Sequence, residues 1–181
     1  VSAVRFYRPQ AAPDYAVYRR LHGDSAPAGY AQTVEAESAA YRSSAVIALN
    51  TDRSGPQVSP SDPARLRVNT LGGSGWARCG QYAVWRVTVP DSGYYRLSVR
   101  YRQNSARGRK TYRRLTVNGT VPFAEAEALP FSFSDAWQTA DLFAGDIYLT
   151  AGENELRLEA VLGPYGAVVR AADETARRLG A

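Results

Sequence analysis

Methionine is absent from the 181 residues, and cysteine and histidine occur once each. The single cysteine, Cys79, excludes an internal disulfide and any metal site built from several cysteines; we expect a small buried apolar side chain, with a reactive thiol as the alternative. No apolar run approaches the roughly 18 residues that a membrane-spanning helix needs, which argues against membrane insertion. Because even position 1 is not methionine, we expect a processed chain or a piece of a longer protein.

Groups for nucleophilic catalysis are equally scarce. The only histidine, His22, follows a short helical pattern, and the one nearby carboxylate that could orient it is Asp24. A serine–histidine or cysteine–histidine pair would have to use this residue, and a single histidine at the end of a helix needs no function. The glycine-rich run 72–75 neither precedes a helix nor ends in Lys-Ser/Thr, so it predicts a flexible loop rather than a phosphate site.

Two pairs of carboxylates stand one residue apart, Glu35/Glu37 and Glu125/Glu127. On a strand such a pair projects to one face, which suits a cation site. It would suit a glycosidase only if another carboxylate lay across a cleft, and the sequence gives no sign of one. We therefore expect a protein without catalytic activity of its own.

Positive charge is concentrated in one segment. The net charge is +5, and Arg96 to Arg114 holds eight basic residues and no acidic one, so fourteen bases and seventeen acids are left for the remainder. A nucleic-acid-binding protein usually presents a wider basic face with aromatic residues for stacking. We therefore expect no nucleic-acid partner.

The pattern between the two ends is that of an all-β domain. Nine short runs alternate or carry β-branched and aromatic residues, with turn signals between them. This predicts an antiparallel β-sandwich over 32–162, preceded by a helical lead-in and linker (1–31) and followed by a C-terminal helix (163–181) that leads into a missing region. The predicted strands are 33–37, 45–49, 65–69, 81–89, 94–102, 112–118, 137–143, 146–150 and 154–162.

The run from Gly80 to Arg102 shows the alternation best. Alternate residues from Ala83 to Val89 are apolar, as are those from Tyr95 to Tyr101, while arginine, threonine and serine fall opposite. With the turn residues 90–93 between them, the two runs predict a half-buried β-hairpin. The expected core residues are Trp85, Val87, Val89, Leu97, Val99, Leu115, Val117, Leu156 and Leu158. We expect the two flanking helices to pack on the edge of the sandwich or on each other.

Five segments in a fixed order resemble carbohydrate-binding modules of the family 6 and family 35 type. They are VEAES (34–38), the run 73–102 that begins GSGW, RRLTVNG (113–119), DAWQT (135–139) and IYLTAGENELRLEA (147–160). The resemblance implies a galactose-binding-like jelly roll. More narrowly, RLRVNTLGGSGW (65–76), the segment 102–119 and the helical flanks resemble the sandwich domain near the N-terminus of some bacterial extracellular solute-binding proteins of carbohydrate ABC transporters. That likeness implies an accessory domain in an extracellular or cell-surface protein.

The resemblance also implies a structural calcium ion. In these modules the EAE segment supplies carboxylates to the metal, which correspond here to Glu35 and Glu37. The closing strand usually adds an aspartate, but this chain departs from the pattern and offers Glu159 instead.

The sugar site of such modules lies in loops at one end of the sandwich, between two aromatic side chains. Trp76 and Trp137 hold those positions, and Asn104 and Gln138 are candidates to bind hydroxyl groups. A second tryptophan that often follows is replaced by Ala140. The alternative is that both tryptophans are packed under loops, in which case sugar binding has been lost.

A second functional hypothesis uses the basic segment. Arg100, Arg102, Arg107, Arg109 and Arg114 would dock an acidic surface of a partner or of the remainder of the same polypeptide. Its alternative is an ordinary solvated strand face. Exposed tryptophans would favour the carbohydrate, and exposed arginines beside buried tryptophans would favour docking.

Overall fold

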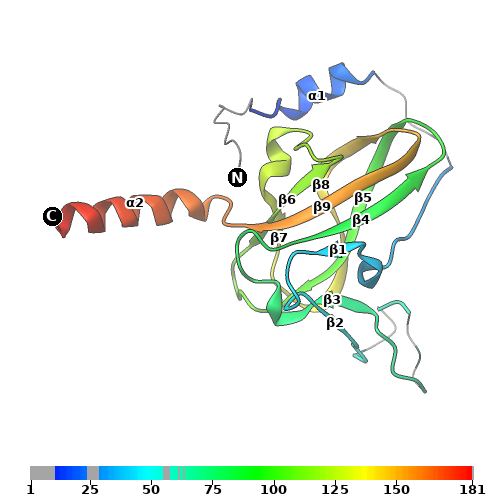
Figure 1. The fold of residues 1–181 in the computed structure, drawn as a ribbon, viewed down its shortest axis with the longest axis horizontal. Helices are drawn as coiled ribbons and strands as arrows, with labels where there is room; N and C mark the ends of the chain where they lie inside the picture. Colours follow the sequence, from blue (N-terminus) through cyan, green and yellow to red (C-terminus); the bar gives the residue numbers. More distant parts are fainter. Residues whose placement is uncertain (1–10, 24–28, 55–57, 61, 63, 181) are drawn as a thin grey trace, which may run out of the picture.

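The structure, a computed structural model, describes residues 11–23, 29–54, 58–60, 62 and 64–180. Its strands form three antiparallel groups, in the orders β1-β4-β9-β6-β7, β2-β3 and β5-β8 (Figure 1). The helices are α1 (Tyr15–Leu21) and α2 (Tyr165–Leu179), with short 3-10 turns η1 (Ala36–Ser38), η2 (Gly73–Gly75) and η3 (Ala124–Ala128). The strands are β1 (Tyr41–Arg42), β2 (Ala48–Asn50), β3 (Thr70–Gly72), β4 (Tyr82–Val89), β5 (Gly93–Gln103), β6 (Thr111–Val117), β7 (Leu129–Phe131), β8 (Ser134–Leu149) and β9 (Gly152–Val161).

The core lies between the five-stranded sheet and the β5–β8 pair. Val87, Leu115 and Leu158 contribute to it from the first sheet, and Tyr94 and Ile147 from the second. Two antiparallel layers that share one apolar interior are a β-sandwich, so the predicted fold class is confirmed.

The predicted faces of β4 and β5 are also confirmed. Six of the nine expected core residues are buried, and Trp85, Leu97 and Val99 are partly buried against the same cluster. Arg86 and Arg96 are exposed, as the alternation requires.

The predicted hairpin of these two strands is wrong, because they belong to different sheets. β4 pairs with β9, where Trp85 lies opposite Leu156, whereas β5 pairs with β8, where Val99 lies opposite Ala140. The turn 90–92 therefore carries the chain across the sandwich. The apolar faces of both strands still meet the same core. A hairpin and a crossover between the two sheets therefore give the same alternation of apolar and polar residues.

Several other strand predictions need correction. Residues 33–37 form an extended segment and the turn η1 rather than a strand, while 65–69 precede β3 instead of forming it. The predicted run 45–49 overlaps β2 only in part, and β1 and β7 were not predicted. The two runs 137–143 and 146–150 are one strand, β8, whose pairing with β5 contains two register shifts.

The two ends of the sandwich differ in their connections. The turn end carries the short turns 90–92, 118–119 and 150–151, and both Asn118 and Gly119 have the positive φ of a two-residue turn. The loop end carries the longer segments 43–47, 73–81 and 104–110.

Helix α1 packs against the turn end and along β8. Asp14 caps it by accepting a hydrogen bond from the Val17 amide at 2.7 Å, and the buried ring of Tyr18 belongs to the core. The Tyr18 hydroxyl accepts a hydrogen bond from the Tyr148 amide at 2.6 Å. The expectation that this helix packs on the sandwich is confirmed; residues 24–28 of the predicted linker lie outside the described residues.

Helix α2 does not pack as expected. It runs away from the sandwich (Figure 1), and only Gly166 of its residues is buried. Its attachment is local, through the ring of Tyr165 against that of Tyr112, with centroids 5.8 Å apart. None of the described helices is long and apolar enough to cross a bilayer.

Candidate functional site

Trp76 lies at the loop end but is engaged with its own domain. Its indole N–H donates to the carbonyl oxygen of Gln81 at 3.1 Å, and its ring lies 6.3 Å from that of Trp85. The guanidinium of Arg113 lies 5.0 Å from the ring centroid and also donates to the Trp76 carbonyl oxygen at 3.0 Å. A Cβ at Gly72 would lie 3.2 Å from the ring, so the backbone there is in close contact with it. These contacts are those of a packed side chain, not of an open platform for a sugar.

Trp137 begins the regular part of β8 and is half-buried. Its indole N–H donates to Asp52 at 3.1 Å, and the same carboxylate oxygen lies 2.9 Å from the Arg102 guanidinium. That guanidinium is 5.1 Å from the Trp137 ring centroid. The tryptophan, the cation and the carboxylate therefore form one triad on the outer side of the β5–β8 pair.

Asp52 connects this triad to the segment between β2 and β3. It accepts a hydrogen bond from the Ser54 amide at 2.7 Å, and the side chain of Asn69 bonds to the Asp52 backbone from both sides, at 2.8 and 2.9 Å. Burial alone would raise the pKa of Asp52, but the hydrogen bonds from Ser54 and Trp137 and the charge of Arg102 outweigh it. The pKa of Asp52 therefore lies below its usual range, and the carboxylate is ionised at neutral pH.

The glycine-rich run 72–75 is part of this framework rather than the flexible loop predicted from sequence. It forms the turn η2, and a Cβ at Gly75 would lie 1.7 Å from the Val46 carbonyl oxygen. Only a residue without a side chain allows the two backbones to approach this closely. The run that follows β3 therefore packs closely against the loop that follows β1.

The two polar candidates differ in their placement. Gln138 is half-buried, and its amide nitrogen is 3.5 Å from the Ser132 carbonyl oxygen, a weak contact that a ligand can replace. Asn104 is exposed in the segment after β5. Gln138 follows Trp137 on β8 but projects to the opposite face, where it lies across from Tyr101, and Asn104 lies at the same end of the sandwich.

The three expected calcium ligands do not form one group. Glu35 accepts a hydrogen bond from Ser59 at 2.9 Å, and Glu37 has a buried carboxylate oxygen, Oε2, without a hydrogen-bond partner. Burial raises the pKa of Glu37, and the charge of Glu35 adds to the increase. Glu159 instead pairs with Arg157 and lies 3.8 Å from Arg114. In the described part of the chain, no three His, Cys, Asp or Glu side chains are grouped as a metal site requires.

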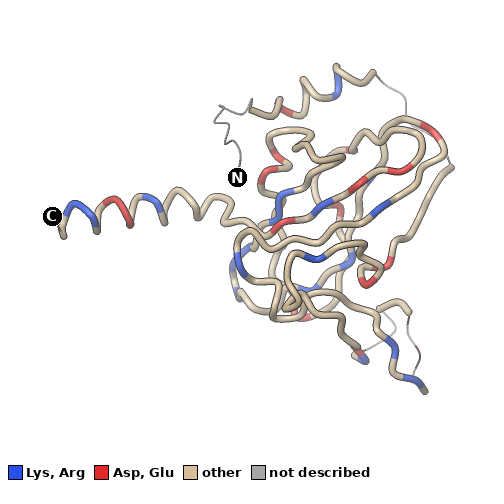
Figure 2. The backbone as a smooth tube through the Cα atoms, in the orientation of Figure 1, with Lys and Arg blue, Asp and Glu red and all other residues tan. Residues whose placement is uncertain are grey.

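The basic segment separates into engaged and exposed residues. Arg102 pairs with Asp52, and Arg114 pairs with Glu127 at 2.6 Å. Arg113 is half-buried against Trp76, and burial lowers its pKa to about 10. On the strands, acidic and basic positions are interleaved (Figure 2).

Three of the five docking candidates face solvent. Arg100, Arg107 and Arg109 are exposed, and none of them has an ion pair with a described carboxylate. Arg107 lies 6.0 Å from the ring centroid of Phe133, which places the loop 104–110 beside the start of β8. Among the described residues, three of the five docking candidates therefore have no ion pair, and the other two are paired within the domain.

The expectation for Cys79 is wrong, because its side chain is exposed at the loop end. It stands in the segment 77–80 between η2 and β4, which crosses the surface and leaves it outside the core. His22 is also exposed, and its ring stacks on that of Tyr148 at 4.4 Å with an interplanar angle of 14°. Neither residue is part of a catalytic arrangement in the described residues.

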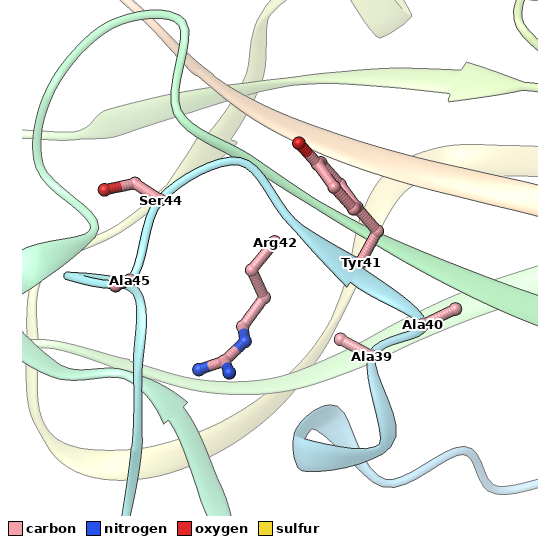
Figure 3. A pocket seen from close by; sticks show the side chains of 6 residues that line it. All are labelled: Ala39, Ala40, Tyr41, Arg42, Ser44 and Ala45. Atoms are coloured by element: carbon pink, nitrogen blue, oxygen red, sulfur yellow. The ribbon is translucent and has the colours of Figure 1, made fainter.

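An open recess of about 390 Å³ adjoins β1 (Figure 3). Its walls are Ala39, Ala40 and Ala45 together with Tyr41, Arg42 and Ser44. Tyr41 and Arg42 point in opposite directions; the Arg42 guanidinium donates to the Ile47 carbonyl oxygen at 2.8 Å, whereas 53% of Tyr41 is exposed. An exposed tyrosine beside a shallow recess is a second surface on which a ring can stack, and the sequence analysis missed it.

No family model and no curated protein sequence matches this chain. Several solved structures resemble it, among them the three that follow. The native family 35 carbohydrate-binding module from Clostridium thermocellum has a TM-score of 0.48 and 25% identity, over 63% of this chain and 75% of that one. The Paenibacillus sp. cycloisomaltooligosaccharide glucanotransferase, complexed with cycloisomaltoheptaose, has a TM-score of 0.49 and 27% identity, over 70% of this chain and 15% of that one. The Podospora anserina GH26-CBM35 β-(1,4)-mannanase has a TM-score of 0.51 and 17% identity, over 72% of this chain and 24% of that one.

The likeness to the mannanase shows a shared sandwich fold. The match spans 24% of the mannanase, so the likeness concerns one part of that enzyme.

Proposed function

We propose that this domain binds carbohydrate without catalysing a reaction, and that Trp137 rather than Trp76 carries the contact. The supporting observation is the triad: Trp137 is half-buried, and Asp52 and Arg102 hold its indole in one position. An indole that is already fixed loses little conformational freedom on binding, and its ring suits the C–H face of a sugar. Asn104, exposed at the same end of the sandwich, provides an amide for a hydroxyl group, whereas Gln138 projects to the opposite face of β8.

The finer context follows the resemblance described above. We propose an accessory domain of an extracellular solute-binding protein that serves a sugar ABC transporter, located outside the cell or on its surface. The support is the order of the segments between 65 and 119 and the helical flanks. The boundaries 1–31, 32–162 and 163–181 belong to the same proposal.

We also propose that two carboxylates bind a calcium ion. The unpartnered Oε2 of Glu37 and the neighbouring carboxylate of Glu35 are hard oxygen ligands of the kind that calcium prefers. Glu159 does not fit, because Arg157 and Arg114 already neutralise it. A calcium ion would relieve the unpaired charge of Glu37, and backbone oxygens and water would complete its shell.

Docking through the basic segment is the second candidate function. The observation that favours it is the exposure of Arg100, Arg107 and Arg109 without carboxylate partners in the described residues. Their counterpart would be an acidic surface of a partner or of the rest of the same polypeptide.

Titration calorimetry with a panel of soluble glycans tests the carbohydrate function. We expect wild-type binding to at least one glycan and a loss for Trp137→Ala of roughly tenfold, because stacking contributes about 0.5–1.5 kcal/mol beyond area burial. Tyr41→Ala is the matched control on a different exposed aromatic. Trp76→Ala is expected to lower the unfolding midpoint, since its ring packs against the core.

The outcomes separate the alternatives. If Tyr41→Ala abolishes binding and Trp137→Ala does not, the sugar sits at the recess and the proposed site is wrong. If no glycan binds, the carbohydrate function is rejected. Binding of the wild-type chain to an acidic protein surface would then support docking, provided that the double variant Arg107→Ala/Arg109→Ala loses that binding.

A further inference from the structure

Helix α2 exposes an apolar stripe that the described part of its own domain covers only in part, through the ring of Tyr112 against that of Tyr165. Tyr165 is 41% exposed, Val169 43%, Val168 68% and Leu179 84%. The helix has 15 residues, a length of about 22 Å, and helices of this length are marginal in water when they pack against nothing. The stripe therefore calls for a partner surface.

The spacing of the stripe fits another helix. Tyr165, Val169, Ala172, Ala176 and Leu179 follow one another at intervals of four, three, four and three residues. This alternation is the seam of a two-helix coiled coil, in which the side chains of one helix insert between those of the other.

Charged residues lie away from this seam. Arg170, Glu174 and Arg178 project from the opposite side, where Arg178 also pairs with Glu174 one turn earlier. Of the positions that flank the seam, only Asp173 is charged; the others are Gly166, Val168, Thr175 and Gly180. A second copy of the same helix can therefore approach without juxtaposing like charges at close range.

We propose that α2 pairs with α2 of a second copy of this chain, in antiparallel orientation, with the two-fold axis between Arg170 and Ala171. In this register Tyr165 faces Ala176 of the second copy, and Val169 faces its Ala172. Leu179 faces Leu162, which precedes the helix and is 43% exposed.

The sizes of these side chains favour the antiparallel register. Each large residue of the central layers meets an alanine, and interfaces pack best when large and small residues alternate across facing positions. A parallel register would set Ala172 and Ala176 against themselves and leave a gap beside each pair of larger residues. The antiparallel register also puts Asp173 next to Gly166 of the second copy, in the first turn of that helix, where the helix dipole favours negative charge.

The contact is small, so the dimer is weak and depends on concentration. Two helices of four turns bury less than the roughly 1,200 Å² of a standard stable interface. Analytical ultracentrifugation from micromolar to millimolar concentration is expected to show a monomer–dimer equilibrium for the wild-type chain.

Two alanines of α2 provide a matched pair of variants. Ala172→Lys places a charge in the centre of the seam and is expected to weaken self-association at least about tenfold. Ala171→Lys makes the same change on the polar side and is expected to leave it unchanged. Circular dichroism of both variants checks that α2 is still helical. A wild-type chain that stays monomeric, or equal effects of the two variants, would overturn the proposal.

Orientation is tested by oxidation in a Cys79→Ser background. When a Val169→Cys variant is mixed with an Ala172→Cys variant, the antiparallel register predicts disulfides mainly between the two different chains. Disulfides mainly between identical chains would show a parallel pair and overturn the proposed register.

Discussion

The turn end and the loop end of the sandwich are stabilised by different means. At the turn end, the rings of Tyr15, Tyr18 and Phe123 pack together with centroids 5.0 to 6.1 Å apart, in the interior. At the loop end, the framework is polar and joins Asp52 to Arg102 and Trp137. Apolar packing at one end supports the fold, while the polar end can exchange its contacts for those of a ligand.

The turn end also protects the edge of β8. The Tyr15 hydroxyl accepts a hydrogen bond from the Asp146 amide at 2.7 Å, and Tyr18 does the same for Tyr148. Unpaired strand edges invite association with other strands, so α1 covers a surface that would otherwise be reactive toward other chains. The close approach depends on Gly145, where a Cβ would lie 2.4 Å from the Tyr15 ring.

The largest expected effect is at the turn end. Phe123→Ala removes a fully buried ring and leaves a cavity, so we expect the free energy of unfolding to fall by about 3–5 kcal/mol. Urea denaturation followed by fluorescence measures it. Leu21→Ala on α1, a residue that is 67% exposed, is the control and should change stability by less than about 0.5 kcal/mol. Equal effects would show that burial of the Phe123 ring does not hold this end together.

The next effect is at the loop end. Gly75→Ala forces a methyl group onto the Val46 carbonyl oxygen, and we expect a loss of about 1–3 kcal/mol from the displacement of backbone. Ser74→Ala, at the exposed neighbouring position, is the control. Hydrogen exchange should show the loss of protection in 43–47 and 70–76 and unchanged protection around Phe123. Uniform loss over both ends would contradict their independence.

Asp52→Asn is expected to act in a pH-dependent way. Because the pKa of Asp52 is lowered in the folded state, its ionised form stabilises the protein above the ordinary aspartate pKa, and this contribution disappears as the pH falls through the folded-state value. At neutral pH we expect the variant to lose about 1–2 kcal/mol, since it gives up charge-assisted hydrogen bonds. Denaturation curves at pH 7 and pH 3 measure the difference, which should narrow at the lower pH. A difference independent of pH would refute the ionised role.

The smallest effect concerns Glu37. Its raised pKa means that the folded protein binds this proton more tightly than the unfolded chain, so the stability that this proton provides is lost as the pH rises through the folded-state pKa. In chelator at neutral pH, Glu37→Gln should therefore raise the melting temperature slightly. Added calcium should raise that of the wild type but not of the variant. Scanning calorimetry with and without calcium measures these melting temperatures. If calcium leaves the melting temperature of the wild type unchanged, the proposed calcium binding is rejected.

Much of the fold was predictable because alternation reports burial directly. The runs 81–89, 94–102, 112–118 and 154–162 correspond to β4, β5, β6 and β9 within one or two residues at each boundary. The failures are segments whose structure depends on remote partners. Residues 33–37 carry a strand-like pattern, yet Ala36 instead accepts a hydrogen bond from the Trp85 indole at 3.0 Å.

The candidate site was predictable in part. Motif positions identified Trp76 and Trp137, but nothing local shows that one is packed and the other is held by Asp52, which is 85 residues away in sequence. The aromatic cluster of α1 did leave a signal, because Tyr15, Tyr18 and His22 are spaced to share one face of a helix.

The sequence by itself determined which residues of each strand point inward, where the turns fall and how positive charge is distributed along the chain, because these follow from side-chain period and composition. Only the tertiary structure decided that β4 and β5 lie in opposite sheets, that Arg102 but not Arg100 is paired with a described carboxylate, and that most of the α2 stripe is exposed. The physical reason is that pairing, ion pairs and burial are relations between segments far apart in the chain. A local pattern is compatible with several such partners, and the packing of the whole sandwich selects one.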